Sequence, residues 1–176
     1  MSVQPGSCSA VNVLFLCTHN SARSILAEGL ATKLGEGRLI GHSAGSHPSG
    51  TVNRHALETL RERGCHVAAL RSKSWEEFVQ PGAIPMDIVI AVCDSAAREA
   101  CPVWPGAPVT ANWACRDPSA ASGDDRTIAL AFRHTADLIT GRLWRLLSIP
   151  FDTVPPAVIA DELTAIAREI SEVEKP

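Results

Sequence analysis

Short apolar runs predict two buried strands in the first half of the chain. Residues 11–16 (VNVLFL) and 87–92 (DIVIAV) are dominated by valine, isoleucine, leucine and phenylalanine. Runs of this length and composition are typical of strands that are covered on both faces. Residues 38–43 and 108–113 form weaker runs of the same kind, and we predict one strand in each.

Between and after these strands, apolar residues recur at helical spacing. A stripe over residues 24–34 ends before Gly35, and a second stripe ends at Gly64, so both glycines are expected to terminate helices. A long helix is predicted from about Asp124. Its apolar face is formed by Ile128, Phe132, Ile139, Leu143 and Leu146.

A capping signal and the order of the elements complete this outline. Ser74-x-x-Glu77 has the form of a capping box and predicts a short helix that Pro81-Gly82 ends. Strands that alternate with helices favour an α/β fold with a parallel sheet between helical layers.

The chain is expected to divide into three parts. We predict a flexible leader over residues 1–10, in which Cys8 has no expected function. Residues 11–148 form the predicted domain and carry all the predicted strands. Pro155-Pro156 interrupts the chain within a C-terminal extension, residues 149–176, whose helix is expected to pack on the domain. The alternative is a helix that binds a partner or a second copy. Its apolar face is formed by Ile159, Leu163, Ile166 and Ile170.

Composition narrows the class of protein without identifying it. The 176 residues suit one domain, and a formal charge of −3 with a pI near 6.1 gives no reason to expect nucleic acid as a partner. The sequence has no secretory signal and no apolar run of membrane-spanning length, so the default location is cytoplasmic. There we expect most of the cysteines to be reduced: Cys8, Cys17, Cys65, Cys93, Cys101 and Cys115.

A candidate anion site lies between the first strand and the first helix. Cys17 ends the strand, and Arg23-Ser24 open the helix, with Thr18, His19, Asn20, Ser21 and Ala22 between them. A strand that turns into a helix aims backbone N–H groups at the turn, which favours a bound oxyanion and a cysteine thiolate. Arg23 adds a charged fork, and Ser24 is placed to donate to the sulfur. The alternative is a buried cysteine beside a surface arginine.

Cys93 follows the second strong strand as Cys17 follows the first. Because ligands bind outside the carboxyl ends of parallel strands, both cysteines are expected on the same rim of the sheet. The alternative for Cys93 is a packing role, since free cysteine behaves as a small apolar residue. Zinc is not expected, because the cysteines lack the Cys-x2-Cys spacing of zinc sites.

These motifs together resemble a known family. The low-molecular-weight protein tyrosine phosphatases are matched by Cys17-x5-Arg23-Ser24, Ser43-Ala44-Gly45-Ser46 and Asp117-Pro118. The segment from Cys93-Asp94-Ser95-Ala96-Ala97 to Cys101-Pro102-Val103-Trp104 is similar to the arsenate reductase branch of that family. The resemblance implies a flavodoxin-like three-layer α/β sandwich, with a central parallel sheet and helices on both faces.

The resemblance also implies a role for each motif residue. Cys17 would form an adduct with arsenate, held by residues 18–22 and clamped by Arg23, with Ser24 as thiolate partner and Asp117 as proton donor. Cys93 would attack the Cys17 sulfur and release arsenite, and Cys101 would then take over the disulfide. A reduced thioredoxin-like partner would then regenerate the thiols. In the alternative, glutathione would attack the Cys17 adduct and a glutaredoxin would complete the cycle; no cofactor or metal is implied.

Two other functions stay open on the same residues. A phosphomonoesterase would use Cys17, Arg23 and Asp117 without the relay, although the chain has no tyrosine to surround an aromatic substrate. A non-catalytic oxyanion sensor would need Arg23 but neither Cys93 nor Cys101. Asp117 is alternatively a turn residue before Pro118. Cys65 and Cys115 are assigned to structure, and His19 is left without a role.

Overall fold

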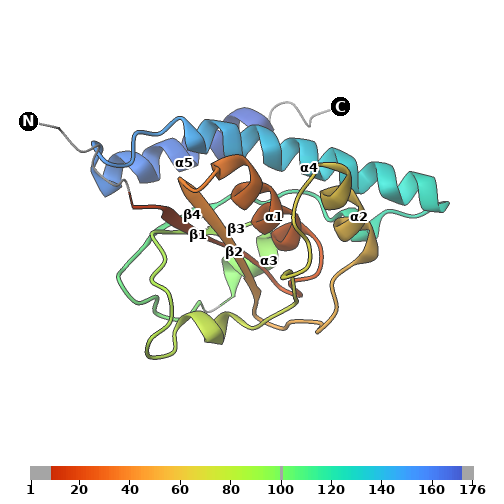
Figure 1. The fold of residues 1–176 in the computed structure, drawn as a ribbon, viewed down its shortest axis with the longest axis horizontal. Coiled ribbons are helices and arrows are strands. Elements are labelled where there is room, and N and C mark those ends of the chain that lie inside the picture. Colours follow the sequence, from red (N-terminus) through yellow and green to blue (C-terminus); the bar gives the residue numbers. More distant parts are fainter. Residues whose placement is uncertain (1–8, 100, 172–176) are drawn as a thin grey trace, which may run out of the picture.

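A four-stranded parallel sheet forms the centre of the protein (Figure 1). The computed structural model describes residues 9–99 and 101–171, so most of the predicted leader, including Cys8, lies outside the described residues. The strand order is β2-β1-β3-β4, and all three neighbouring pairs are parallel. The strands are β1 (Val11–Cys17), β2 (Leu39–Gly45), β3 (Ile88–Ala91) and β4 (Val109–Asn112). The predicted parallel α/β fold is confirmed.

The helices follow the predicted apolar stripes. The first helix ends at Gly35 and the long helix is capped by Asp124, whose side chain accepts a hydrogen bond from the Thr127 backbone N–H at 2.8 Å. The α-helices are α1 (Arg23–Gly35), α2 (Arg54–Glu62), α3 (Asp94–Arg98), α4 (Asp125–Leu147) and α5 (Pro156–Ser171). Two short 3₁₀ helices are η1 (Trp75–Phe78) and η2 (Pro118–Ala120).

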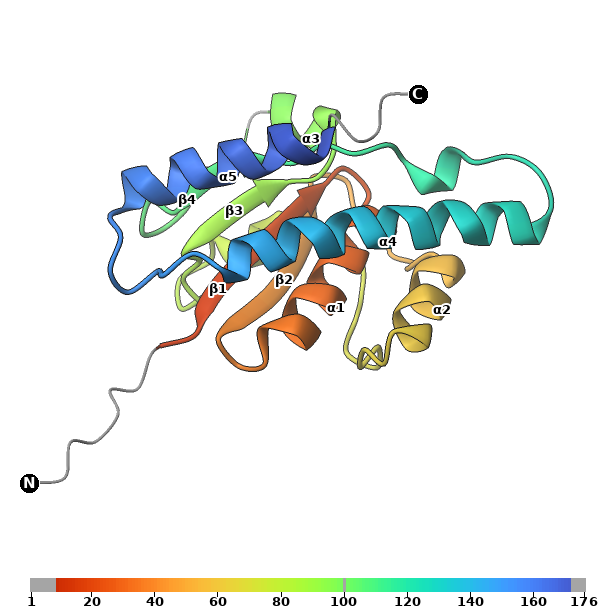
Figure 2. The ribbon, with the colours of Figure 1, turned by 90° about the horizontal axis from the view of Figure 1, so that it is seen from above.

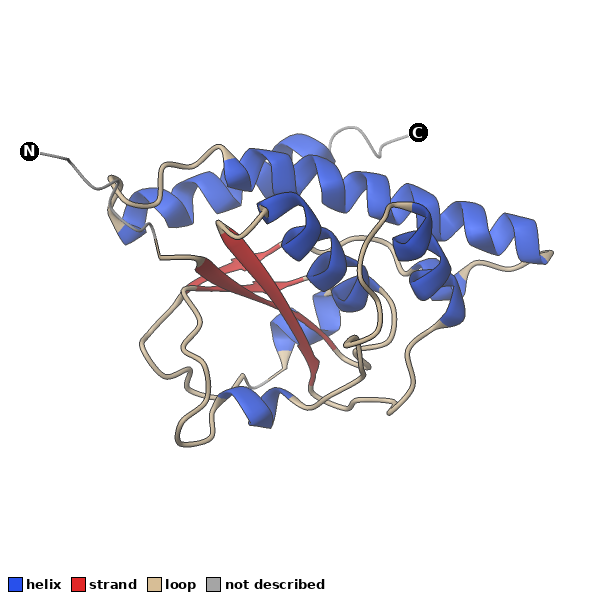
Figure 3. Ribbon diagram, viewed as in Figure 1, coloured by secondary structure: helices blue, strands red, loops and turns tan. Residues whose placement is uncertain are grey.

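The two faces of the sheet are covered very differently. Figures 2 and 3 show α1, α4 and α5 together on one side of the sheet, whereas the other side is mostly loop. Gly41 of β2 faces the side covered by helices, where a Cβ would come within 2.5 Å of the Glu28 carbonyl on α1. Its neighbour His42 faces the opposite way and contacts Phe78 of η1 with ring centroids 5.9 Å apart. The layers on the two faces of the sheet therefore differ: one is built of long helices and the other mostly of loops.

A hollow of about 500 Å³ lies on the loop-covered side of the sheet. Leu16, Val89 and Ala91 form part of its floor, and Cys101 and Trp104 reach it from the segment that follows α3. The residues between β3 and β4 are therefore not packed tightly against the sheet over this area.

The capping box predicted at Ser74 is only half formed. The Ser74 hydroxyl accepts a hydrogen bond from the Glu76 backbone N–H at 3.2 Å. Glu77, which the box would turn back toward Ser74, forms an ion pair with Arg71 instead. The resulting helix is a 3₁₀ turn that ends at Phe78, before the predicted stop at Pro81-Gly82.

The last helix, α5, packs along β4 and α4. The indole N–H of Trp113 donates to the Leu163 carbonyl at 2.9 Å, and the Leu163 side chain is fully buried. Ile159 and Ile166 are buried with it, while the side chain of Ile170 lies outside the described residues. Among the described helices, none has the length and apolar character needed to cross a bilayer.

Candidate active site

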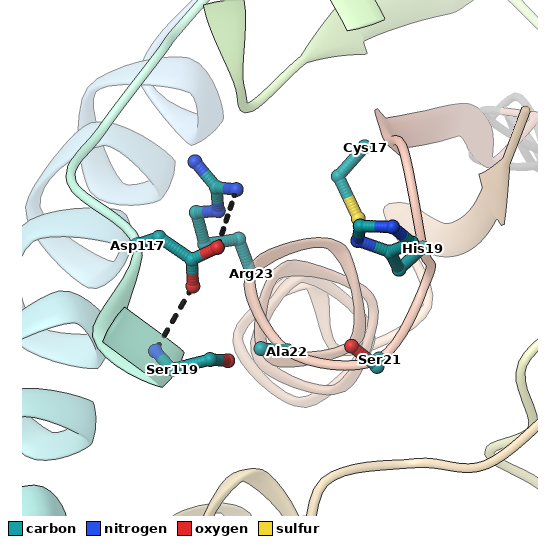
Figure 4. A pocket seen from close by; sticks show the side chains of 7 residues that line it. All are labelled: Cys17, His19, Ser21, Ala22, Arg23, Asp117 and Ser119. Carbon is teal, nitrogen blue, oxygen red and sulfur yellow. Dashed lines mark hydrogen bonds and ion pairs between the residues drawn. The ribbon is translucent and has the colours of Figure 1, made fainter. Parts of the chain in front are cut away.

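Cys17 lies at the carboxyl end of β1, where the chain turns into α1 (Figure 4). Its Sγ accepts a hydrogen bond from the Asn20 backbone N–H at 3.2 Å and lies 2.9 Å from the Ser24 hydroxyl. The side chain is 5% exposed. N–H and hydroxyl donors at these distances stabilise a thiolate, so the predicted contact of Ser24 with the sulfur is present.

Asn20 holds the loop in shape from behind. Its backbone has a φ of 47°, in the left-handed region, and its side chain is fully buried. The amide N–H groups donate to the Ser24 and Ser43 hydroxyls at 2.9 Å each, and the amide oxygen accepts from the Lys73 backbone N–H at 2.8 Å. Gly45 lets β2 approach the loop, because a Cβ there would come within 2.5 Å of the Thr18 carbonyl.

A buried ion pair supports this network. The Lys73 ammonium lies 3.1 Å from a carboxylate oxygen of Glu28 and donates to the Ser43 hydroxyl at 3.4 Å and the Arg71 carbonyl at 3.3 Å. Ser43 in turn donates to the same Glu28 oxygen. Lys73 and Glu28 are not predicted from the sequence, because no local pattern marks either residue. Together with Asn20 they fix the back of the anion loop.

In front of the loop lies a small cavity of about 80 Å³. Arg23 borders it and donates to the Cys115 carbonyl at 2.9 Å and to the Asp117 carboxylate at 3.0 Å. The Ser119 backbone N–H donates to the other Asp117 oxygen at 2.9 Å, as Figure 4 shows. The cavity is lined by Cys17, His19, Ser21, Ala22, Arg23, Asp117 and Ser119.

The predicted site residues thus divide into two groups. Cys17, Arg23 and Asp117 meet at the cavity, together with His19, Ser21 and Ala22 of the loop. The side chains of Thr18 and Asn20 have other partners, so only the backbone of these two residues is available to contact a bound anion. His19 was left without a role, and its ring lies at the cavity beside the cysteine (Figure 4).

The second predicted cysteine reaches the same edge of the sheet. Cys93 follows β3, is 2% exposed, and caps α3 by accepting from the Ala96 backbone N–H at 3.3 Å. Its Sγ lies 3.9 Å from the Thr18 hydroxyl. Because Thr18 directly follows Cys17, this contact links the two cysteine-bearing segments. Cys93 and Cys17 therefore lie on a common rim, as the sequence predicts.

Cys101 lies on an exposed loop beyond α3. Although the residue is exposed, its thiol is partly covered by its neighbours, and this partial burial is the main cause that raises its pKa. A hydrogen bond with the Trp104 side chain lowers the pKa, and the charge of Glu99 raises it further. Cys65 is buried beyond α2, and burial raises its pKa as well. Within residues 9–99 and 101–171, no three metal-ligating side chains are grouped as a metal site.

Comparisons with known proteins agree on one family. Residues 12–155 match the low molecular weight phosphotyrosine protein phosphatase family. An arsenate reductase of Bacillus licheniformis is 33% identical over 78% of this chain and 95% of its own length. A glutaredoxin arsenate reductase of Synechocystis sp. is 32% identical over 62% and 80%.

One solved structure, described as an arsenate reductase in the intermediate state, has a TM-score of 0.62 and 28% identity to this chain. The likeness covers 78% of this chain and 97% of that one. The family match runs from β1 through α4 and ends immediately before α5 begins at Pro156.

Proposed function

The chain belongs to the low molecular weight phosphotyrosine protein phosphatase family, and we propose that it reduces arsenate to arsenite with Cys17 as the nucleophile. The observation that carries this proposal is the position of Cys93. A second thiol reaches the rim of the anion loop and contacts Thr18, the residue after Cys17. A phosphatase needs one thiol at this place, whereas a reductase needs a second thiol, which forms a disulfide with the first as arsenic is reduced.

In the first step, arsenate binds in the cavity beside Arg23, whose fork suits two oxygens of a tetrahedral anion. The Cys17 thiolate attacks arsenic, an S–As bond forms, and one arsenate oxygen leaves as water after taking a proton. Asp117 is the proton donor in this proposal, because it lines the same cavity. It has to be protonated for this step, and binding of the anion to Arg23 displaces it from the ion pair.

In the second step, the Cys93 sulfur attacks Cys17 Sγ. The S–As bond breaks and its electron pair stays on arsenic, which leaves as arsenite, while the two sulfurs become a disulfide. Cys101 then attacks Cys93 and frees Cys17, which moves the disulfide to an exposed loop. Disulfide geometry requires Cα atoms within roughly 7 Å, so the segment carrying Cys93 and Cys101 has to rearrange during the relay.

A thiol reductant completes the cycle by reducing the disulfide between Cys93 and Cys101. Two partners fit this chemistry, a thioredoxin, or glutathione with a glutaredoxin. A cycle of this kind needs Cys17, Cys93 and Cys101 to be reduced again after each turnover, which suits the cytoplasm.

A phosphomonoesterase is the second candidate, and the position of Asp117 at the cavity supports it. Once protonated, this carboxyl group would give its proton to the leaving oxygen of a phosphate ester. That chemistry needs neither Cys93 nor Cys101. A non-catalytic oxyanion sensor would use the same cavity without turnover.

One set of variants separates the three functions. Wild type, Cys17→Ser, Cys93→Ser and Cys101→Ser are compared for arsenite release with each reductant system and for hydrolysis of p-nitrophenyl phosphate. We expect Cys17→Ser to stop both reactions, and Cys93→Ser to stop arsenite release while sparing hydrolysis. Full arsenate turnover by Cys93→Ser with thioredoxin would contradict the relay. Oxyanion binding without either reaction in the wild type would favour the sensor.

A further inference from the structure

Thr18 connects Cys93 to an acidic residue that the relay leaves without a role. The Thr18 hydroxyl lies 3.2 Å from a carboxylate oxygen of Glu99 and 3.9 Å from Cys93 Sγ. A hydroxyl has one proton to donate, and an ionised carboxylate can only accept. The Thr18 proton is therefore directed to Glu99, and its lone pairs are left for the Cys93 S–H. The contacts run in one direction, from Cys93 through Thr18 to Glu99.

The environment of Glu99 suits a group that receives a proton. Its second oxygen, Oε2, is buried and has no hydrogen-bond donor among the residues that the structure describes. Burying a charged oxygen without a donor is costly, and a proton that arrives on the carboxylate removes this charge. Arg98, the basic residue of α3, is exposed, so it does not offer Glu99 a buried counter-charge.

Glu99 also faces the third thiol of the relay. Its negative charge is one of the causes that raise the pKa of Cys101. The titratable groups around the carboxylate are therefore Cys93, reached through Thr18 from the end of β3, and Cys101 on the loop after α3. Glu99 therefore has a hydrogen-bonded route to the Cys93 proton through Thr18, whereas it acts on Cys101 only through its charge.

We propose that Glu99 is a positioning residue that accepts the Cys93 proton through the Thr18 hydroxyl as Cys93 attacks the Cys17 sulfur. The inference rests on the proposed arsenate reduction. The S–H proton of Cys93 passes to Thr18 while the Thr18 proton passes to Glu99. The electron pair left on Cys93 forms the S–S bond, and the electron pair of the broken S–As bond reduces arsenic from As(V) to As(III). Glu99 then releases its proton to solvent.

Glu99→Gln tests this step, because it keeps the size and the hydrogen bond to Thr18 but removes the proton acceptor. Single-turnover arsenite release is measured by rapid quench between pH 6 and pH 9. We expect a loss of roughly 100-fold at neutral pH, at the lower end of general acid–base effects. The loss should shrink toward about pH 8.5, where an ordinary thiol ionises without help. A merely structural defect would be the same at every pH.

Asp94→Asn is the matched control, since it removes one negative charge from the exposed side of the same short helix. It should keep the wild-type pH profile. Hydrolysis of p-nitrophenyl phosphate by Glu99→Gln should also stay at the wild-type rate, which shows that the anion loop is intact. A pH-independent loss, or wild-type arsenite release by Glu99→Gln, would overturn the proposal.

Hydrogen peroxide separates this inference from the proposed function. Peroxide oxidises Cys17 to a sulfenic acid, and Cys93 attacks that sulfur with loss of water, so the same disulfide forms without arsenate. Formation of the Cys17–Cys93 disulfide is followed by mass spectrometry in wild type and in Glu99→Gln. A pH-dependent deficit here, with no arsenite release by the wild type, would support the role of Glu99 and reject arsenate as the substrate. Equal rates would reject the role of Glu99.

Discussion

The loop after β1 and the segment after β3 each bring a cysteine to the same edge of the sheet, but they are supported in opposite ways. Behind Cys17, the buried side chains of Asn20 and Lys73 connect the loop to α1 and β2. Behind Cys93 there is one short helix and a hollow of about 500 Å³. In the proposed relay, the sulfur that would bind the anion is therefore held in place, whereas the segment that would carry the disulfide outward borders an open space.

The strongest test of the rigid side is Lys73→Met. Removal of the ammonium takes away the cation that is hydrogen-bonded to the Glu28 carboxylate in a largely buried site, and breaking such a pair costs about 3–5 kcal/mol. Urea unfolding measures the loss. Lys33→Met, an exposed lysine on α1, should stay within about 0.5 kcal/mol of wild type. Recovery of stability in a Lys73→Met/Glu28→Gln double variant would show that the unpaired charge causes the loss.

Asn20→Ala should be the next largest effect. It leaves the Lys73 backbone N–H without its acceptor, which costs about 1–3 kcal/mol. It also removes hydrogen bonds to the Ser24 and Ser43 hydroxyls, which keep other partners, so we expect about 2–4 kcal/mol in total. Both arsenite release and phosphate ester hydrolysis should fall with it. Unfolding by urea and both activities are measured on the same sample. A stable variant with normal hydrolysis would show that the loop keeps its shape without this side chain.

On the mobile side, Trp104→Ala should cost little for so large a side chain. Trp104 is half-buried at the hollow, whereas Trp113 is 1% exposed and bonded to α5. Truncating a packed tryptophan costs about 3–5 kcal/mol, which we expect for Trp113→Ala, against less than about 1 kcal/mol for Trp104→Ala. Urea unfolding compares the two variants. Equal losses would mean that the segment after α3 is packed as tightly as the core.

The smallest expected effect concerns the reactivity of Cys101. Because its pKa is raised, chiefly by burial and further by Glu99, a smaller fraction is thiolate at neutral pH than for an ordinary thiol. Alkylation of Cys101 at pH 7, followed by peptide mapping, should be slower than that of a small free thiol. Glu99→Gln should speed it, and Trp104→Phe should slow it by removing a hydrogen bond. Alkylation as fast as that of the free thiol would contradict this picture.

Local patterns are sufficient to predict most of this fold. The strands and the long helices follow from apolar runs and spacing, and the contact of Cys17 with Ser24 follows from a loop in which these residues are seven positions apart. Patterns of this kind do not show that one face of the sheet is covered mainly by loops, because loop packing depends on contacts distant in sequence. The division at residues 148 and 149 stays a prediction.

Several contacts at the site could not be predicted, because the residues that form them lie far apart in the sequence. Lys73 meets Glu28 across 45 positions and Asn20 across 53, and Glu99 meets Thr18 across 81. None of these residues lies in a motif whose spacing points to its partner. Asp117, by contrast, was assigned through the family resemblance, and the structure places it against Arg23. The catalytic roles of Cys93, Cys101 and Asp117 stay predictions until the variants are measured.

The ion pair between Arg23 and Asp117 has a consequence for selectivity. The carboxylate occupies one terminal nitrogen of the guanidinium group that would bind an oxyanion, so an incoming anion competes with it for that donor. Arsenate and phosphate have the same shape and charge, and the displacement costs both the same. Discrimination between them is therefore chemical, made after binding by whether the adduct on Cys17 yields to a second thiol or to water. We expect phosphate to compete with arsenate for the site, so that the rate of arsenite release falls as the ratio of phosphate to arsenate rises.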